Sequence, residues 1–316
     1  MEFQNKRIVV TGGSGFLGTY VVKAFQGRGC KNVISLGSRD FDLRLNADVQ
    51  RLVRELKPDV VVHMAAVVGG IGANRSHPGQ FFYENAIMGL QLIEACRKAE
   101  VSKFVQIGTI CSYPKITPVP FKEDELWNGY PEETNAPYGL AKKMLMVQLQ
   151  SYRTEYGMNG ITVMPANLYG PGENFDLETS HVIPALIRKC LEAKQAGSPK
   201  ITLWGDGTAS REFLFVEDAA RGIVLATEKY NDPMPVNLGV GREMTIRAVA
   251  ELVADIIGFR ESIEWDPSKP NGQPRRCVDT SRAKRSFGFE AQVALEDGLR
   301  RTISWYVSQR AVNIAA

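Results

Sequence analysis

The chain has 316 residues, 44 % of them hydrophobic and 23 % charged, so it is long enough to bury a sizeable core in one large domain or two smaller ones. A formal net charge of +3 with scattered lysines and arginines argues against nucleic-acid binding, and five cysteines without a CxxC pair argue against a disulfide framework or a structural zinc site. No stretch is apolar enough for a signal peptide or membrane span, so we expect a cytoplasmic protein with neither a membrane nor a nucleic-acid partner, and with no metal.

The first half of the chain alternates short runs rich in β-branched residues with longer amphipathic segments. This alternation is typical of βαβ units and predicts an α/β fold, a doubly wound parallel sheet of the Rossmann type with helices on both faces. The expected strands are Ile8–Thr11, Val33–Leu36, Val60–His63, Phe104–Ile107 and Thr162–Met164. The expected helices are Gly15–Gln26, Asp48–Leu56, Gln80–Lys98 and Pro137–Tyr156.

The pattern changes after residues 169–172, where glycine and proline interrupt the rhythm. Helices are expected near Ile183–Lys194, Val216–Lys229, Ile246–Ile257 and Leu295–Val307. We therefore predict a dinucleotide-binding domain over residues 1–168 and a smaller α/β substrate-binding lobe over 169–316. Residues 213–240 are expected to return to the first domain, because Val236–Leu238 has the pattern of another strand of the main sheet.

A glycine-rich segment follows the first strand at once and opens the first helix, with Gly12, Gly15 and Gly18 at three-residue spacing. Glycines at this place permit a tight turn, close approach of the backbone to a pyrophosphate and close packing of the helix. The alternative is a glycine-rich turn in an unrelated βα unit. The order of strand, loop and helix favours a dinucleotide site.

The end of the second strand carries Arg39 where NAD-binding proteins usually have an acidic residue. A guanidinium can form a forked hydrogen bond to a 2′-phosphate, and the Ser14 and Ser38 hydroxyls can add donors, so the pattern favours NADP(H). A solvated loop arginine is the alternative. Asp42 and Leu43 follow and are expected at the adenine edge.

The strongest catalytic pattern is Tyr138-x-x-x-Lys142 on a predicted helix, which puts both side chains on one face. A lysine ammonium near the phenol lowers the tyrosine pKa, so that Tyr138 can exchange a proton with a substrate carbonyl oxygen. Thr109, about 30 residues earlier at the end of a strand, supplies a hydroxyl for the same oxygen. The alternative is an exposed helix with an unrelated tyrosine and lysine.

Several long segments of this chain resemble the GDP-L-fucose synthase family of extended short-chain dehydrogenases/reductases. The resemblance rests on residues 65–74 (AAVVGGIGAN), 108–115 (GTICSYPK), 134–142 (TNAPYGLAK), 164–171 (MPANLYGP), 180–188 (SHVIPALIR) and 204–214 (WGDGTASREFL). The resemblance extends over nearly the whole length of the chain, and the last two segments distinguish the family from related 4-epimerases and 4,6-dehydratases.

The resemblance implies 3,5-epimerisation and 4-reduction of GDP-4-keto-6-deoxy-D-mannose to GDP-L-fucose with NADPH. It assigns Cys111 and His181 as the acid/base pair that inverts the carbons beside the C4 ketone, since a thiolate and an imidazole can both titrate near neutral pH. Without the matching flanks, Cys111 would be interpreted as a core residue and His181 as an ordinary loop residue. Of the other histidines, His63 is expected to be structural and His77 a helix cap or surface residue.

The resemblance also assigns binding residues. Those for NADP(H) are Gly12, Ser14, Gly15, Phe16, Leu17, Gly18, Arg39, Asp42, Leu43, Ala65, Ala66, Lys142, Asn167 and His181. Those for the substrate nucleotide are Val182, Leu186, Arg188, Trp204, Arg211 and Arg276, with arginines for the diphosphate and Trp204 beside the base or ribose.

The chain also departs from the family pattern. Thr109 replaces a serine, Gly139-Leu140 replaces Ala-Ile, Ala166 replaces a threonine and Arg276 stands where lysine is frequent. A reshaped pocket and another GDP-linked keto sugar, such as a 6-deoxy-heptose, therefore remain open, and a non-catalytic NADP-binding module is a distant alternative. We further expect a homodimer that pairs the helices near 80–98 and 137–156 with those of a second copy.

Overall fold

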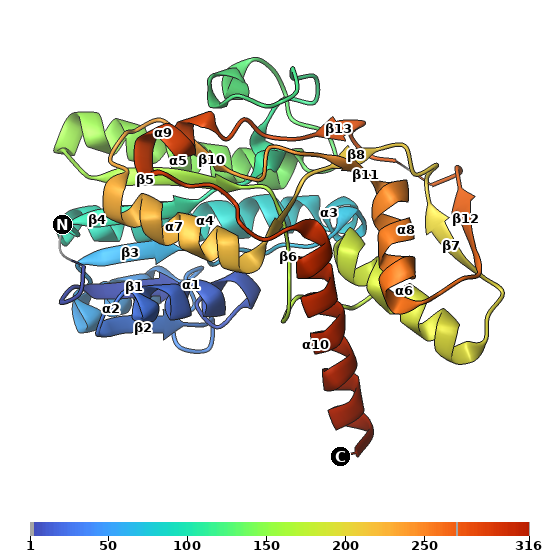
Figure 1. Cartoon of the computed structure of the whole chain (residues 1–316). Helices are drawn as coiled ribbons and strands as arrows, with labels where there is room; N and C mark the ends of the chain where they lie inside the picture. The colour runs from blue at the N-terminus through green and yellow to red at the C-terminus, as the bar shows by residue number, and fades with distance from the viewer. Residues whose placement is uncertain (1–2, 270, 316) are drawn as a thin grey trace.

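A six-stranded parallel sheet forms the body of the computed structural model, which describes residues 3–269 and 271–315 (Figure 1). From edge to edge its order is β2-β1-β3-β4-β5-β10, and every neighbouring pair is parallel. The predicted doubly wound Rossmann fold is confirmed. The strands are β1 (Arg7–Thr11), β2 (Asn32–Leu36), β3 (Val60–His63), β4 (Lys103–Ile107), β5 (Gly160–Pro165) and β10 (Val236–Leu238).

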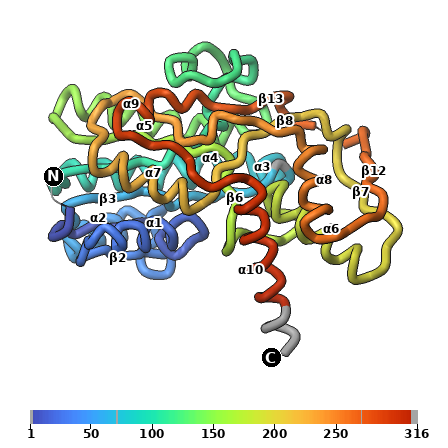
Figure 2. Tube along the Cα trace, viewed as in Figure 1, coloured from blue at the N-terminus to red at the C-terminus, as the bar shows by residue number. Residues whose placement is uncertain are grey.

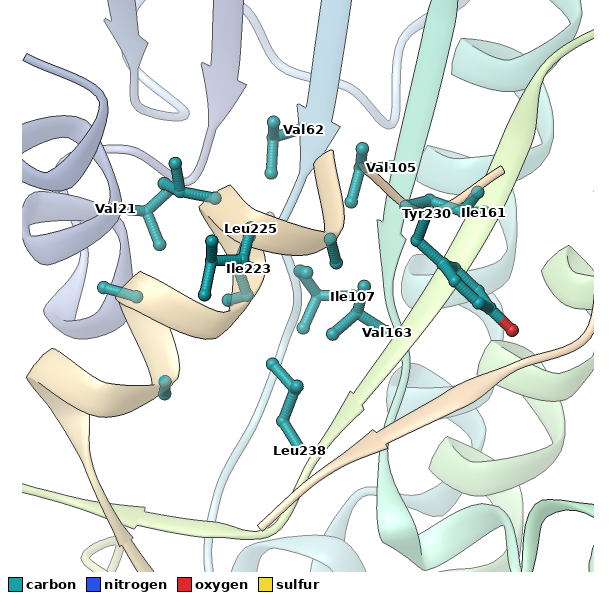
Figure 3. Close-up of a cluster of buried hydrophobic side chains, with 14 of the residues drawn as sticks. Val21, Val62, Val105, Ile107, Ile161, Val163, Ile223, Leu225, Tyr230 and Leu238 are labelled. Atoms are coloured by element: carbon teal, nitrogen blue, oxygen red, sulfur yellow. The ribbon is translucent and has the colours of Figure 1, made fainter. Parts of the chain in front are cut away.

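Helices cover both faces of this sheet because successive side chains of each strand point to opposite sides. Val10 and Val62 face a core shared with α1 (Phe16–Gly27) and α7 (Val216–Lys229), of which Figure 3 shows a part. Val9 and Val61 face the opposite core, which belongs to α2 (Asn46–Leu56), α4 (Pro78–Lys98) and α5 (Ala136–Tyr156).

The strand order reverses direction at β1, since β2 lies on one side of it and β3 on the other. The loops that leave the carboxyl ends of β1 and β3 therefore diverge, and ligands of α/β sheets bind in the crevice at such a point. The glycine-rich loop and the 65–74 segment both begin here. The topology thus brings two of the predicted motifs to one edge of the sheet.

The second lobe contains small sheets and three long helices around a separate core (Figure 2). Its two-stranded parallel sheet pairs β7 (Lys200–Trp204) with β12 (Ser262–Asp266), and α6 (Val182–Ala196) packs against α8 (Ile246–Ile257). The helix α10 (Leu295–Ala315) leaves the body beside this lobe and ends at the C-terminus (Figure 1). Short pairings complete the lobe: β6 (Asn167–Tyr169) with β9 (Phe213–Phe215), and β8 (Ser210–Arg211) with both β11 (Met244–Thr245) and β13 (Arg275–Arg276).

Strand β10 pairs with β5 at the edge of the main sheet, and α7 packs against α1, so α7 and β10 lie with the first lobe. The remaining elements are short and were not expected: α3 (Ile71–Ser76), η1 (Ile110–Ser112), η2 (Glu123–Trp127) and α9 (Ser281–Phe287). Among the described residues, no helix combines the length and apolar character needed to cross a membrane.

Candidate active site

The glycine-rich loop lies where the backbone has no room for side chains. A Cβ on Gly12 would lie 2.8 Å from the backbone nitrogen of Ala65, and Gly12 has φ +70°, which L side chains rarely adopt. A Cβ on Gly18 would lie 2.1 Å from the Gly12 carbonyl oxygen, so this glycine lets α1 pack onto the loop. Gly15 is the N-cap residue of α1, and no side chain caps it. The first N–H groups of α1 therefore suit a pyrophosphate.

Arg39 is exposed just beyond β2, with no carboxylate at ion-pair distance in the part of the chain that the structure describes. The Ser14 hydroxyl lies over the same turn, 2.8 Å from where a Cβ of Gly37 would be. Asp42, in contrast, is held by Arg44, whose Nη2 lies 2.7 Å from Oδ2. The guanidinium of Arg39 thus remains available for an anion, whereas the Asp42 carboxylate is already engaged.

The other residues predicted at the cofactor divide between surface and core. Phe16 and Leu17 are half-buried in the first turn of α1, and Ala65 and Ala66 are half-buried after β3. Leu43 is buried in the core that faces α2 and α4, so its side chain has a packing role. Asn167 donates from Nδ2 to the carbonyl of Glu212 at 2.8 Å.

One residue that holds the segment after β3 was not predicted. Buried Asn85 of α4 accepts from the N–H of Val67 at 3.0 Å and donates back to its carbonyl at 2.9 Å. It fixes the backbone directly after Ala65 and Ala66. An isolated asparagine inside an amphipathic helix gives no sequence signal for such a role.

Thr109, Cys111 and Tyr138 are brought together by close packing of η1 against α5. Thr109 is the N-cap of η1, and its hydroxyl accepts from the Cys111 N–H at 3.1 Å. The Ser112 hydroxyl donates to the carbonyl of Gly139 at 2.8 Å. A Cβ on Gly139 would lie 2.4 Å from the Cys111 carbonyl oxygen, so α5 approaches η1 more closely than an alanine would permit. This contact accounts for the glycine found where the family has alanine.

The Tyr138 pKa is not lowered in this structure, contrary to the expectation for a tyrosine near Lys142. Burial raises the pKa of Tyr138 well above its ordinary value, and neighbouring Cys111 adds to the rise. Burial also lowers the pKa of Lys142 to about 8, because an ammonium loses hydration there. Desolvation is therefore the main cause of the shift in both groups.

His63 lies in β3 and accounts for part of the polar environment near Lys142. Its Nδ1 is 2.9 Å from the Thr11 hydroxyl, while its buried Nε2 has no partner among the described residues. Burial lowers the pKa of His63 to about 3, and the charge of Lys142 contributes. His63 is thus a neutral core residue, as expected, and exposed His77 separates α3 from α4.

Cys111 differs from the other four cysteines, all of which are buried. It is partly exposed, and Nη1 of Arg276 lies 3.7 Å from its Sγ. Buried Arg276 is held in place by Gln273, whose Oε1 accepts from Nε and Nη2 at 3.1 and 3.0 Å. A guanidinium beside a thiol stabilises the thiolate by charge attraction.

Arg211 lies beside Arg276, because the two residues are register partners in the β8–β13 pair. Burial lowers the pKa of Arg211 to about 10, and the charge of Arg276 adds to that shift. Two arginines predicted for the substrate diphosphate therefore converge near Cys111. Their mutual repulsion favours an anion between them.

His181 is the residue before α6, and its side chain is 59 % exposed. Its Nδ1 lies 2.9 Å from Oε1 of Glu173, a buried carboxylate. That hydrogen bond raises the pKa of His181, while burial raises the pKa of Glu173. Glu173 was not predicted, although it lies only two residues after the matched segment at 164–171.

The segment that carries His181 contacts the first lobe at two places. The carbonyl of Thr179 accepts from the N–H of Gly70 at 3.1 Å, and a Cβ on Gly70 would lie 2.9 Å from the Ser180 carbonyl. Farther back, the Tyr20 hydroxyl of α1 donates to the Pro171 carbonyl at 2.9 Å. These contacts hold the His181 segment over the loops that leave β1 and β3.

The remaining residues predicted for the substrate are not equally available. Trp204 is 57 % exposed at the end of β7, and Val182 is half-buried. Leu186 is only 3 % exposed and packs in the core of the second lobe. Arg188 donates to the Phe175 carbonyl and to Glu192, so its guanidinium already has partners.

Glu212, inside the matched 204–214 segment, holds the two lobes' strands together. Its fully buried carboxylate accepts from the N–H groups of Val240, Gly241 and Val278. Multiple N–H donors compensate the burial of a charge, although burial still raises the Glu212 pKa. The sequence match contained this residue but did not reveal its structural role.

Comparison with known proteins agrees with this fold. Residues 8–239 match the family model described as the NAD dependent epimerase/dehydratase family. The chain belongs to that family.

Within it, the chain belongs to the group of the GDP-L-fucose synthases. It is 38 % identical over 307 residues to GDP-L-fucose synthase 1 of Arabidopsis thaliana, covering 97 % of this chain and 95 % of that protein. A GDP-L-fucose synthetase from Naegleria fowleri bound to NADP has a TM-score of 0.89 at 30 % identity and covers 98 % of this chain and 94 % of its own. A GDP-6-OMe-4-keto-L-xylo-heptose reductase from C. jejuni has a TM-score of 0.90 at 28 % identity, with 97 % and 99 % covered.

Proposed function

We propose that this enzyme converts GDP-4-keto-6-deoxy-D-mannose to GDP-L-fucose by 3,5-epimerisation and NADPH-dependent 4-reduction. One observation carries the proposal: the thiol of Cys111 is partly exposed and contacts Arg276. Cys111 lies in the short helix η1, which Thr109 caps and against which α5 packs. A simple reductase needs the tyrosine and the lysine but no polarised thiol. A thiol base beside the reduction site is what an epimerase that finishes with a reduction requires.

The proposed cofactor is NADP(H), which would supply the hydride that reduces C4. The chain's own fit rests on the side-chain-free surfaces at Gly12 and Gly18, the glycine N-cap of α1 and the exposed Arg39. Tyr138 is proposed to give a proton to the C4 oxygen, and Lys142 to donate to the nicotinamide ribose. Exchanging Arg39 for serine tests the cofactor: the ratio of NADPH to NADH turnover should fall about tenfold or more, and an unchanged ratio would exclude Arg39 from this role.

The charges around Cys111 and His181 support a division of labour between base and acid. The thiol of Cys111, which lies beside the Arg276 guanidinium, would remove a proton from a ring carbon beside the C4 ketone. Glu173 favours a protonated imidazole, which would deliver a proton to the opposite face of the enolate. The C–H bond broken on one face and the C–H bond formed on the other balance, and the ketone is regenerated.

A GDP-linked keto-heptose is the second candidate substrate. The observation that favours it is the likeness to the C. jejuni heptose reductase, together with Gly139 in place of the family's alanine beside Cys111. Assembly of Thr109, Cys111 and Tyr138 at one helix junction speaks against a non-catalytic NADP-binding module.

The deciding experiment is an NMR assay of purified enzyme with NADPH in deuterated buffer, run with GDP-4-keto-6-deoxy-D-mannose and with a GDP-4-keto-heptose. The expected product from the first substrate is GDP-L-fucose carrying deuterium at C3 and C5. A reduced product without deuterium at C3 and C5 would mean that the enzyme is a 4-reductase without epimerase activity. Turnover of the heptose alone would move the proposal to the second candidate.

A homodimer is proposed from the exposed apolar residues on the paired helices α4 and α5. Phe82 and Tyr83 on α4 and Val147 on α5 are 41, 64 and 45 % exposed. Burying these side chains against a second copy would remove apolar area from water. Light scattering after size exclusion should give a dimer mass for the wild type and a monomer mass for Tyr83→Glu with Val147→Glu; a monomeric wild type would overturn it.

A further inference from the structure

The segment between β6 and α6 folds back on itself. It thereby brings together Glu173 and His181, which are eight positions apart in the sequence. At its tip, Oδ1 of Asp176 accepts from the N–H groups of Glu178 and Thr179 and from the Thr179 hydroxyl, at 3.1, 3.0 and 2.9 Å. The Ser180 N–H donates to the Asp176 carbonyl at 2.8 Å. This turn returns the chain so that His181 meets Glu173.

Glu173 is unusual for a carboxylate in a connecting segment, because its side chain is only 4 % exposed. One oxygen, Oε1, is 2.9 Å from Nδ1 of His181, and the other, Oε2, is buried without a hydrogen-bond partner in the described part of the chain. A surface ion pair would leave both oxygens in water. Burying a carboxylate costs free energy, so this ion pair contributes little net stability by itself.

Aromatic packing from α10 holds the same segment in place. The ring of Phe175 stacks on Tyr306 with centroids 3.9 Å apart and planes 7° apart, and Trp305 lies 6.0 Å away. Tyr20 fixes the segment at Pro171 from the other side. Glu173 lies between these two anchors, and this limits its freedom to move away from His181.

We infer that Glu173 is a positioning residue for His181, holding the proton on Nδ1 and directing Nε2 toward the substrate as the proton donor of the epimerisation. The inference rests on the proposed function, because it assigns a second residue to the same acid/base step. When the proton on Nε2 passes to the enolate carbon, the ring is left neutral, with Nδ1–H still donating to Glu173. Water then returns a proton to Nε2 before the next turnover.

The charge distribution around His181 agrees with this assignment. The hydrogen bond and the charge of Glu173 raise the His181 pKa, which keeps the imidazole protonated above its ordinary range. Other charged groups on the packed elements have partners elsewhere or are solvated. Asp176 is held by Thr179, Arg188 and Arg310 lie against Glu192, and Arg75 and Glu178 are exposed.

The test replaces Glu173 by glutamine and measures the His181 pKa by NMR titration of the histidine ring protons in full-length enzyme. Glu173→Gln keeps the shape but removes the charge, so the His181 pKa should fall by about one unit. Glu173→Asp, which keeps a carboxylate, should restore part of the shift. Glu178→Gln, which removes an exposed carboxylate from the same segment, is the matched control and should leave the pKa unchanged.

Activity and stability separate positioning from a merely structural role. In Glu173→Gln the alkaline limb of the kcat profile should move down with the His181 pKa, kcat should fall about tenfold or more, and KM should change little. The melting temperature should not fall, since a buried charge has been removed.

An unmoved His181 pKa would overturn the inference, and so would a loss of stability without a shift in the pH profile. If the wild type proves unable to incorporate deuterium, the proposed function fails, yet the titration still decides whether Glu173 controls His181. The two failures are therefore distinguishable.

Discussion

Cys111 and His181 lie in opposite chemical surroundings. Cys111 is on a loop of the first lobe, next to the guanidinium of Arg276 and near Arg211. His181 is on a segment that leads into the second lobe, hydrogen-bonded to the buried carboxylate of Glu173. The thiol thus has a cation for a neighbour and the imidazole an anion, and the anion raises the pKa of His181, as suits a proton donor.

The largest effect is expected when the proposed base and the proposed acid are replaced one at a time. Cys111→Ser and His181→Asn should each lower overall turnover by about 10²–10⁴-fold. They should differ in solvent exchange: Cys111→Ser should lose deuterium incorporation, while His181→Asn should keep slow exchange, because the thiolate can still remove and return a proton. NMR of recovered substrate measures this, and equal loss of exchange in both variants would break the assigned roles.

A second test sharpens the contrast by altering only the cation. Arg276→Met should slow alkylation of Cys111 by iodoacetamide about tenfold at neutral pH, because the thiolate loses its charge partner, and Arg276→Lys should recover part of the rate. Mass spectrometry of the labelled peptide follows Cys111 separately from the four buried cysteines. The control is Arg275→Met, since neighbouring Arg275 pairs with Glu243 instead; equal slowing in both variants would contradict the prediction.

The cationic side of the site also predicts a pH dependence for cofactor binding. Burial lowers the Lys142 pKa to about 8, so above that pH the amine must take up a proton to act as an ammonium donor. NADPH affinity should therefore weaken about threefold to tenfold from pH 8 to 9, with proton uptake on binding. Calorimetry in buffers of different ionisation enthalpy measures both quantities.

Lys103 offers the control for this measurement. Burial lowers the pKa of Lys103 to about 8 as well. Lys103 is the first residue of β4, however, and its ammonium donates to the Tyr230 carbonyl. Lys142→Met should abolish the proton uptake, whereas Lys103→Met should retain it. Uptake that survives in Lys142→Met would assign the titration to another group.

The smallest expected effect comes from closing the space between Cys111 and α5. Gly139→Ala would put a methyl group 2.4 Å from the Cys111 carbonyl, so the enzyme should lose about 1–3 kcal/mol of unfolding free energy. Gly79→Ala in α4 meets no atom within 4 Å and is the control, with a neutral or slightly stabilising result. Denaturant unfolding measures both variants. Full stability of Gly139→Ala would show that η1 can move away, and the Cys111 surroundings would then be adjustable.

Much of the fold follows from local patterns. The parallel strands of the first half lie within about two residues of their predicted ends, because β-branched runs and amphipathic helices carry clear periodicities. The short strands β8, β11 and β13 could not be predicted, because pairs of two residues have no period of their own. Helix α10 runs to Ala315, well past the expected Val307.

The site divides in the same way. The sequence by itself determined the glycine loop, the exposed Arg39 and the Tyr138 to Lys142 spacing, since each depends on neighbours along the chain. Only the tertiary structure decided that Arg276 reaches Cys111 across 165 positions, that Leu186 is core and that Lys142 is desolvated instead of acidifying Tyr138. Contacts between distant segments and the loss of water on burial are properties of the packed chain, and no local pattern encodes them.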